Sequence, residues 1–161
     1  MTTTVLAVDD SADSRLLLST ILGRAGFAVL TAATGREALA AAPDVEAVLL
    51  DVSLPDMSGI EVCRLLRARA DTADTPLLLV SGYATVRDVR DGLDAGADAY
   101  LSKPYSAAQL VAQLRHVLAG PEAGLATTAA AAATASALSG FGGGTGLRSW
   151  VRIPSRQARS A

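Results

Sequence analysis

The stretch AVLLDVSLPDMSG, residues 47–59, joins an unbroken apolar run to a carboxylate and then to a loop that contains proline and glycine. Val48, Leu49 and Leu50 indicate a strand that is buried on both faces, as in a parallel sheet. Asp51 follows directly, and a charge at the end of such a strand is costly to bury without a partner. The sequence therefore predicts that another part of the chain supplies a partner for Asp51.

Short apolar runs and helical patterns alternate along the chain on both sides of this stretch. Strands are predicted at residues 4–8, 28–32, 46–51, 76–81 and 97–102, and helices at residues 14–26, 34–42, 58–70, 85–96 and 106–119. Because this alternation implies right-handed crossovers, we predict an α/β fold, a doubly wound five-stranded parallel sheet with helices on both faces. The strand order 2-1-3-4-5 is one of two common orders, and periodicity alone does not choose it. Apolar spacing also predicts that Leu17 and Val86 face the core.

The composition limits the classes to which this chain can belong. Half of its 161 residues are hydrophobic, which is enough for a packed core, and its net charge of −2 gives no general argument for binding nucleic acid or acidic membranes. The single cysteine, Cys63, excludes an internal disulfide and fits a reducing compartment. The chain shows no signal peptide and no run that approaches the roughly 20 apolar residues of a membrane span. We therefore expect a cytoplasmic protein without a membrane span.

Charge and composition both change near Gly120. Residues 1–119 carry 10 Lys and Arg against 15 Asp and Glu, whereas residues 120–161 carry four Arg and one Glu. All but three residues of 123–146 are Ala, Gly, Ser or Thr, a composition that buries too little apolar area to offset the entropy of ordering the chain. The sequence therefore predicts one domain over residues 1–120 and a disordered tail over residues 121–161. Whether this tail docks on an acidic partner or membrane surface, or is foreign to the protein, is left open.

Polar side chains gather where the predicted strands end. Asp9 and Asp10 follow the first strand, Asp51 ends the third, Ser81 ends the fourth and Lys103 follows the fifth. Ligands of open parallel sheets bind outside the carboxyl ends of the strands, so these five side chains are expected to meet at one edge. Taken singly, each has a plainer interpretation, since adjacent acids before a helix are often helix caps and a serine at a strand end is often a turn residue. Those interpretations account poorly for all five together.

This set of side chains predicts a site for a divalent cation and a phosphoryl group. Crowded carboxylates repel one another, and a hard cation such as Mg²⁺ prefers oxygen ligands and removes that repulsion. A carboxylate can accept a phosphoryl group covalently, and phosphoryl transfer depends mainly on positioning and on neutralising charge. Lys103 and Ser81 are suited to contact the phosphoryl oxygens.

The chain resembles the receiver domains of response regulators from two-component signalling. The resemblance lies in four segments, VLAVDDSADSR (5–15), VLLDVSLPDMSGIE (48–61), LLLVSGYA (77–84) and AGADAYLSKP (95–104). These segments occur in the order and spacing of that family, and the resemblance covers about residues 4–119. It implies a single-domain receiver of the chemotaxis type, with the flavodoxin-like strand order 2-1-3-4-5.

The resemblance implies a role for each acidic residue of the predicted site. Asp51 corresponds to the phosphoacceptor of the family. Asp9 and Asp10 correspond to the acidic pair that holds Mg²⁺, with Asp10 as the direct ligand. Together with Asp51, the backbone carbonyl of Ser53 completes the protein ligands, so Mg²⁺ is the implied cofactor.

The resemblance also implies how phosphorylation is read and how long it lasts. Lys103 and Ser81 correspond to the groups that bind the phosphoryl oxygens. Ser81 moves inward, and Tyr100 then turns from solvent into the vacated space and changes the face formed by residues 85–119. Without the resemblance, Tyr100 is interpreted as an ordinary edge-strand aromatic. Ser53 and Tyr83 flank the path of the attacking water, and the bulk of Tyr83 predicts slow autodephosphorylation.

We therefore predict a response regulator receiver that accepts a phosphoryl group from a histidine kinase and acts on an unidentified protein target. It catalyses only its own phosphoryl transfer and autodephosphorylation, and the sequence shows no DNA-binding or enzymatic output domain. The alternatives are a receiver fragment of a larger hybrid kinase or regulator and a phosphorelay intermediate, and homodimerisation is left open. A phosphatase of the haloacid-dehalogenase type is a weaker alternative, since that family needs a second Asp where this chain has Ser53.

Overall fold

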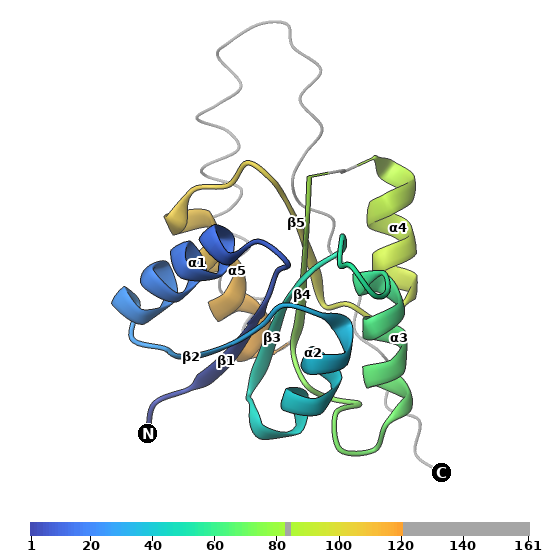
Figure 1. Ribbon diagram of the computed structural model, residues 1–161, viewed down its shortest axis with the longest axis horizontal. Helices are drawn as coiled ribbons and strands as arrows, with labels where there is room; N and C mark the ends of the chain where they lie inside the picture. The colour runs from blue at the N-terminus through green and yellow to red at the C-terminus, as the bar shows by residue number, and fades with distance from the viewer. Residues whose placement is uncertain (83–84, 121–161) are drawn as a thin grey trace, which may run out of the picture.

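The computed structural model describes residues 1–82 and 85–120, which form one parallel sheet covered by helices (Figure 1). The strands are β1 (Thr4–Val8), β2 (Ala28–Ala32), β3 (Ala47–Asp51), β4 (Leu77–Ser81) and β5 (Ala99–Ser102). They are hydrogen bonded in the order β2-β1-β3-β4-β5, and every neighbouring pair is parallel. The predicted fold class is confirmed, and the strand order is the one that the resemblance implied.

Helices cover both faces of this sheet. They are α1 (Ala12–Arg24), α2 (Gly35–Ala41), α3 (Gly59–Ala68), α4 (Val86–Asp94) and α5 (Ala107–Ala119), and a short 3₁₀ helix, η1 (Ala42–Asp44), follows α2. Figure 1 shows α1 and α5 on one face and α2, α3 and α4 on the other. Within the described part of the chain, no helix is long and apolar enough to cross a bilayer.

The central strands explain the unbroken apolar run of the sequence. All five residues of β3 are buried, and so are all five residues of β4. Val48 and Leu50 pack on the side of α2 and α3, whereas Leu49 packs on the side of α1 and α5. Each leucine buried in this way contributes about 1.5–3 kcal/mol. An apolar side chain is therefore needed at every position of β3 before Asp51.

Two apolar side chains that were predicted to face the core are exposed instead. Leu17 on α1 is 56% exposed, and Val86 at the start of α4 is 69% exposed. On α1 the buried side chains are Leu18 and Leu22. The prediction for Leu17 is wrong because a run of consecutive leucines fits more than one helical stripe, and only the packing against the sheet selects one.

Candidate functional site

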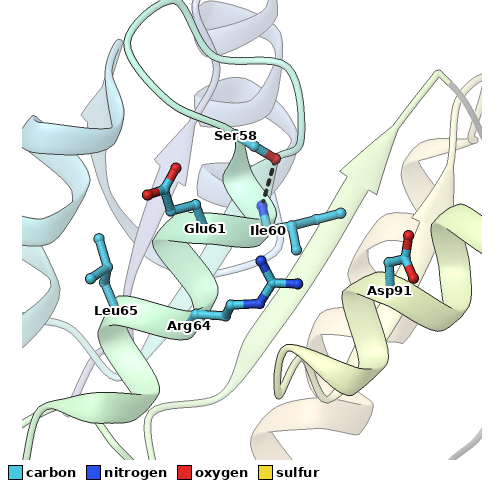
Figure 2. Close-up of a pocket in the computed structure, with 6 residues that line it drawn as sticks. All are labelled: Ser58, Ile60, Glu61, Arg64, Leu65 and Asp91. Carbon is cyan, nitrogen blue, oxygen red and sulfur yellow. Dashed lines mark hydrogen bonds between the residues drawn. The ribbon is translucent and has the colours of Figure 1, made fainter.

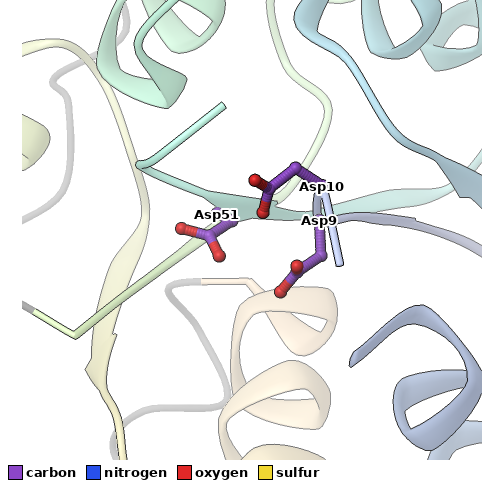
Figure 3. Close-up of side chains that lie close together, drawn as sticks. All are labelled: Asp9, Asp10 and Asp51. Atoms are coloured by element: carbon purple, nitrogen blue, oxygen red, sulfur yellow. The ribbon is translucent and has the colours of Figure 1, made fainter. Parts of the chain in front are cut away.

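Three carboxylates meet at the carboxyl edge of the sheet (Figure 3). Asp9 and Asp10 directly follow β1, and Asp51 is the last residue of β3. One carboxylate oxygen from each residue lies within 4.8 Å of the other two. Asp9 and Asp51 are buried, whereas Asp10 is exposed. The structure therefore brings the predicted acids together, and such an oxygen-only set suits a hard divalent cation.

Lys103 is the positive group that faces this acidic cluster. Its Nζ lies 2.8 Å from Oδ2 of Asp51 and 3.2 Å from Oδ2 of Asp9. The Lys103 backbone N–H donates a 2.8 Å hydrogen bond to the Ser81 carbonyl, which ties the chain after β5 to the end of β4. Lys103 is thus the partner that the sequence required for Asp51. One ammonium that contacts two of the three clustered carboxylates still leaves an excess of negative charge.

Burial and charge oppose each other in this ion pair. Burial raises the pKa of Asp51 and the charge of Asp9 adds to the rise, while hydrogen bonds from Lys103 and from the Ser53 N–H oppose it without cancelling it. Burial alone would lower the pKa of Lys103, but its hydrogen bonds and charge interactions with Asp51 and Asp9 outweigh burial and raise it. Lys103 is therefore held protonated beside Asp51, while burial still favours the neutral form of the Asp51 carboxyl.

The two neighbouring acids are held in different ways. Oδ1 of Asp9 accepts a 2.9 Å hydrogen bond from the Ser11 N–H, and its Oδ2 faces Lys103. The Asp10 carboxylate is exposed and accepts no hydrogen bond from any described residue. Ser11 is the N-cap of α1 and accepts from the Ser14 N–H at 3.3 Å. The plainer interpretation of the two acids as helix caps is therefore wrong, and the Asp10 side chain stays available to a ligand.

The loop that follows Asp51 is fixed at several points. The Ser53 N–H donates a 2.9 Å hydrogen bond to Oδ1 of Asp51, and Ser53 pairs with Ser58 in an isolated antiparallel bridge. Gly59 lies so close to the end of β3 that any side chain there would collide with the Asp51 carbonyl oxygen. The first two N–H groups of α2 donate to the Asp56 carboxylate, and mainly the first of these hydrogen bonds lowers its pKa. Sequence reasoning assigned no role to Asp56 or Gly59.

Tyr100 occupies the inside of the protein, which corrects one expectation. Its side chain is 5% exposed, in the core that lies against α4, whereas the sequence-based prediction placed it in solvent before phosphorylation. Burial is the main cause that raises the pKa of Tyr100, and a side-chain hydrogen bond with Ser81 opposes it. A methyl group at Gly92 of α4 would come within 2.7 Å of Leu79 Cδ1 and 3.1 Å of Tyr100 Cδ2. Gly92 therefore leaves the space that the ring fills.

A separate groove lies between α3 and α4 (Figure 2). Five side chains of its lining come from α3 and its cap, and Asp91 comes from α4; they are Ser58, Ile60, Glu61, Arg64, Leu65 and Asp91. The groove combines both signs of charge with two apolar side chains, and it contains no member of the acidic cluster. The candidate site for a cation and a phosphoryl group is therefore the carboxyl edge of the sheet and not this groove.

Two predicted features lie outside the described residues. Tyr83, expected to obstruct the attacking water, is one of them, and the predicted tail over residues 121–161 is the other. The slow autodephosphorylation and the disordered tail therefore stay predictions.

Known proteins share this arrangement of fold and sequence. Residues 5–115 match the family model described as the response regulator receiver domain. Response regulator MprA of Mycolicibacterium vanbaalenii is 42% identical over 116 residues, which cover 71% of this chain and 49% of that protein. Among solved structures, Vibrio cholerae chemotaxis protein CheY4 is 35% identical with a TM-score of 0.69, and the match covers 73% of this chain and 99% of that one. The signal receiver domain of a histidine kinase from Syntrophus aciditrophicus is 29% identical with a TM-score of 0.68, over 73% of this chain and 91% of that one.

The chain therefore belongs to the response regulator receiver domain family. This assignment decides against a phosphatase of the haloacid-dehalogenase type, and the family is not a classical enzyme family. The chain spans about half the length of the curated relatives that it matches.

Proposed function

We propose that Asp51 accepts a phosphoryl group from the phosphohistidine of a histidine kinase, and that the chain acts as a response regulator. One observation carries this proposal. In a chain of the receiver family, Asp51 lies at the carboxyl edge beside two further carboxylates, with Lys103 Nζ 2.8 Å away. A cytoplasmic location would follow from this proposal, because ATP, the source of the phosphoryl group on the histidine kinase, is cytoplasmic.

The residues at this edge fit Mg²⁺. The proposed direct ligands are the carboxylates of Asp10 and Asp51 and the backbone carbonyl of Ser53, with Asp9 as the second member of the acidic pair that holds the ion. Their support is an oxygen-only donor set with an excess of negative charge that Lys103 does not neutralise. When bound, Mg²⁺ would offset the charge on the phosphoryl oxygens during transfer. Asp9 is engaged by Ser11 and Lys103, so we assign the direct contact to Asp10 rather than to Asp9.

The transfer itself asks for positioning more than for acid–base chemistry. A carboxylate oxygen of Asp51 forms a bond to phosphorus while the bond between phosphorus and the imidazole nitrogen breaks, and its electron pair stays on the imidazole. The Ser53 N–H holds Oδ1 of Asp51 during this step. Lys103 would pair with one phosphoryl oxygen, and the buried hydroxyl of Ser81 would donate a hydrogen bond to another.

The signal would follow from the contact between Ser81 and Tyr100. If Ser81 turns to the phosphoryl group, its hydrogen bond with the buried Tyr100 changes, and the free energy of the ring's packing against α4 changes with it. Since Tyr100 packs against α4 through Gly92, the face formed by α4, β5 and α5 responds. We propose that an unidentified protein target reads this face, and a second copy of the chain is one candidate.

The test is the intact mass of the full chain after incubation with acetyl phosphate and Mg²⁺. We expect one added phosphoryl group on the wild type and none on Asp51→Asn or in EDTA. Asp56→Asn is a matched control, because its carboxylate caps α2 rather than joining the cluster, and it should still be phosphorylated. An adduct that persists in Asp51→Asn would contradict the proposed acceptor, and no adduct on the wild type would contradict the chemistry.

A phosphorelay or hybrid-kinase role is the second candidate function. It is supported by the likeness to the receiver domain of the Syntrophus histidine kinase and by the partial coverage of the curated relatives. A relay receiver must return its phosphoryl group to a second histidine. Incubating the phosphorylated chain with a histidine phosphotransfer domain separates the two roles. Only a relay member transfers its phosphoryl group to that domain before the group is lost by hydrolysis.

A further inference from the structure

Arg15 contacts the backbone of both neighbouring acids, Asp9 and Asp10. It belongs to the first turns of α1, and its Nη1 donates hydrogen bonds to the Asp9 carbonyl at 2.8 Å and to the Asp10 carbonyl at 3.0 Å. The side chain is half-buried; its hydrogen bond to the Asp9 carbonyl is partly shielded from water, whereas the one to the Asp10 carbonyl is exposed. Arg15 therefore clamps the short connection between β1 and α1 at two successive peptide groups.

This clamp matters more for Asp10 than for Asp9. The Asp9 side chain has two direct restraints, the Ser11 N–H on Oδ1 and Lys103 on Oδ2. No described residue donates a hydrogen bond to the Asp10 carboxylate, which is exposed. The position of Asp10 is consequently set through its backbone alone, and Arg15 is a side chain that holds that backbone.

We infer that Arg15 is a positioning residue that organises Asp10 and Asp9 for Mg²⁺ by fixing their peptide groups. The inference rests on the proposed function in one respect, the binding of Mg²⁺ at the acidic cluster. Two effects of Arg15 on that binding have opposite signs. Its positive charge disfavours a second cation nearby, whereas its two hydrogen bonds remove the freedom that the ligands would otherwise lose on binding.

The restraint is expected to outweigh the charge. The guanidinium is engaged on the carbonyl side of the loop, and solvent screens its charge from the exposed Asp10 carboxylate. Outer residues that orient metal ligands typically change metal affinity 10- to 100-fold when they are removed. We therefore expect Arg15→Met, which keeps the length but has no donors, to weaken Mg²⁺ binding about tenfold. Arg15→Lys, which keeps the charge and a donor, should recover part of the loss.

The experiment is calorimetric titration of Mg²⁺ into the full chain for the wild type, Arg15→Met, Arg15→Lys and Arg24→Met. Arg24 is the matched control, since it removes the same charge from the last turn of the same helix, away from the loop. The phosphorylation yield with acetyl phosphate at saturating Mg²⁺ is the second readout. A positioning residue predicts a yield that returns to the wild-type level in Arg15→Met once Mg²⁺ is saturating.

The possible outcomes separate this inference from the proposed function. Weaker binding by Arg15→Met, with partial recovery by Arg15→Lys and no change in Arg24→Met, supports the clamp. Binding by Arg15→Met that equals or exceeds that of the wild type overturns the clamp while the proposed function stands. A wild type that does not bind Mg²⁺ overturns both. If Arg15→Met does not fold, Arg15→Lys decides alone: weaker Mg²⁺ binding there supports the clamp, and unchanged affinity overturns it, because the contact with both carbonyls would then not be needed.

Discussion

Two basic side chains contact carboxylates at opposite ends of the sheet, and they are used differently. At the carboxyl edge, Lys103 is 33% exposed and faces Asp9 and Asp51. At the amino ends of β4 and β5, Arg67 from α3 is 9% exposed and pairs with Asp98 at 2.9 Å. Arg67 also donates to four backbone carbonyls, at positions 72, 73, 75 and 96.

The difference lies in what each cluster leaves unsatisfied. Every nitrogen of the Arg67 guanidinium has an acceptor, and the one carboxylate, Asp98, also accepts from the Leu77 N–H. This cluster is closed, and it ties the end of α3 to the starts of β4 and β5. At the other end the Lys103 ammonium contacts two of three clustered carboxylates, and the third, Asp10, has no donor among the described residues. An excess of one charge with open ligand positions suits the binding of a cation, whereas complete pairing is typical of a structural contact.

Breaking the closed cluster should have the largest effect on stability. We expect Arg67→Ala to lower the free energy of unfolding by about 3 kcal/mol or more, since it removes a buried charged donor from several acceptors. Urea unfolding with and without Mg²⁺ measures this, and Mg²⁺ should not restore the loss. Arg64→Ala, an exposed change on the same helix, should stay within about 0.5 kcal/mol. If Mg²⁺ stabilises Arg67→Ala by more than it stabilises the wild type, the Arg67 cluster is not independent of the acidic cluster and the comparison is wrong.

Removing the Lys103 ammonium from the open cluster of Asp9, Asp10 and Asp51 should lower stability by a smaller amount, and Mg²⁺ should reverse the loss. Lys103→Met leaves two buried carboxylates without their ammonium, and we expect it to cost about 1–3 kcal/mol in EDTA, a range reduced because Lys103 is partly exposed. A divalent cation can take over the neutralising role, so saturating Mg²⁺ should return the unfolding midpoint close to that of the wild type. The two titrations of unfolding against Mg²⁺ thus distinguish a replaceable charge from an irreplaceable one.

The pH dependence of stability should report the cost of burying the ionised Asp51 carboxylate. Burial raises the pKa of Asp51 above its ordinary 3.8, so the neutral form is favoured in the folded state. Its contribution to stability is complete below the unfolded pKa and is lost as the pH rises through the folded one. In EDTA we therefore expect Asp51→Asn to be more stable than the wild type at pH 7, with the difference shrinking towards pH 4. Urea unfolding at both pH values tests this, and an Asp51→Asn protein that is less stable at pH 7 would contradict it.

The smallest effect is expected at the contact between Tyr100 and α4. Gly92→Ala gains about 1 kcal/mol of helix propensity but crowds Leu79 and Tyr100, so the net change in stability should be within about 1 kcal/mol. The crowding should make the Tyr100 ring more exposed, which its NMR ring shifts report. Gly23→Ala on α1 is the control, since a methyl group there meets nothing within 4 Å and should leave Tyr100 unchanged. An unchanged Tyr100 in Gly92→Ala would show that the space at position 92 does not hold the ring.

Much of the molecule was predictable because side-chain type carries the signal. The apolar run before Asp51 predicted a strand buried on both faces, and alternation with helices predicted the parallel sheet. The polar residues at the strand ends predicted the cluster of Asp9, Asp10, Asp51 and Lys103, since parallel strands must end at one edge. The strand order came from the resemblance and not from periodicity.

What the sequence alone determined is therefore the sheet, its edge and the chemical groups that gather there. Only the tertiary structure decided that Arg15 clamps the backbone of the acidic pair, that Asp56 caps α2, and that Tyr100 lies inside. The first two contacts are made to backbone carbonyl and N–H groups, which are nearly independent of residue type, so no pattern of side chains predicts them. The third depends on the space that Gly92 leaves, and that space exists only once α4 has packed against the sheet.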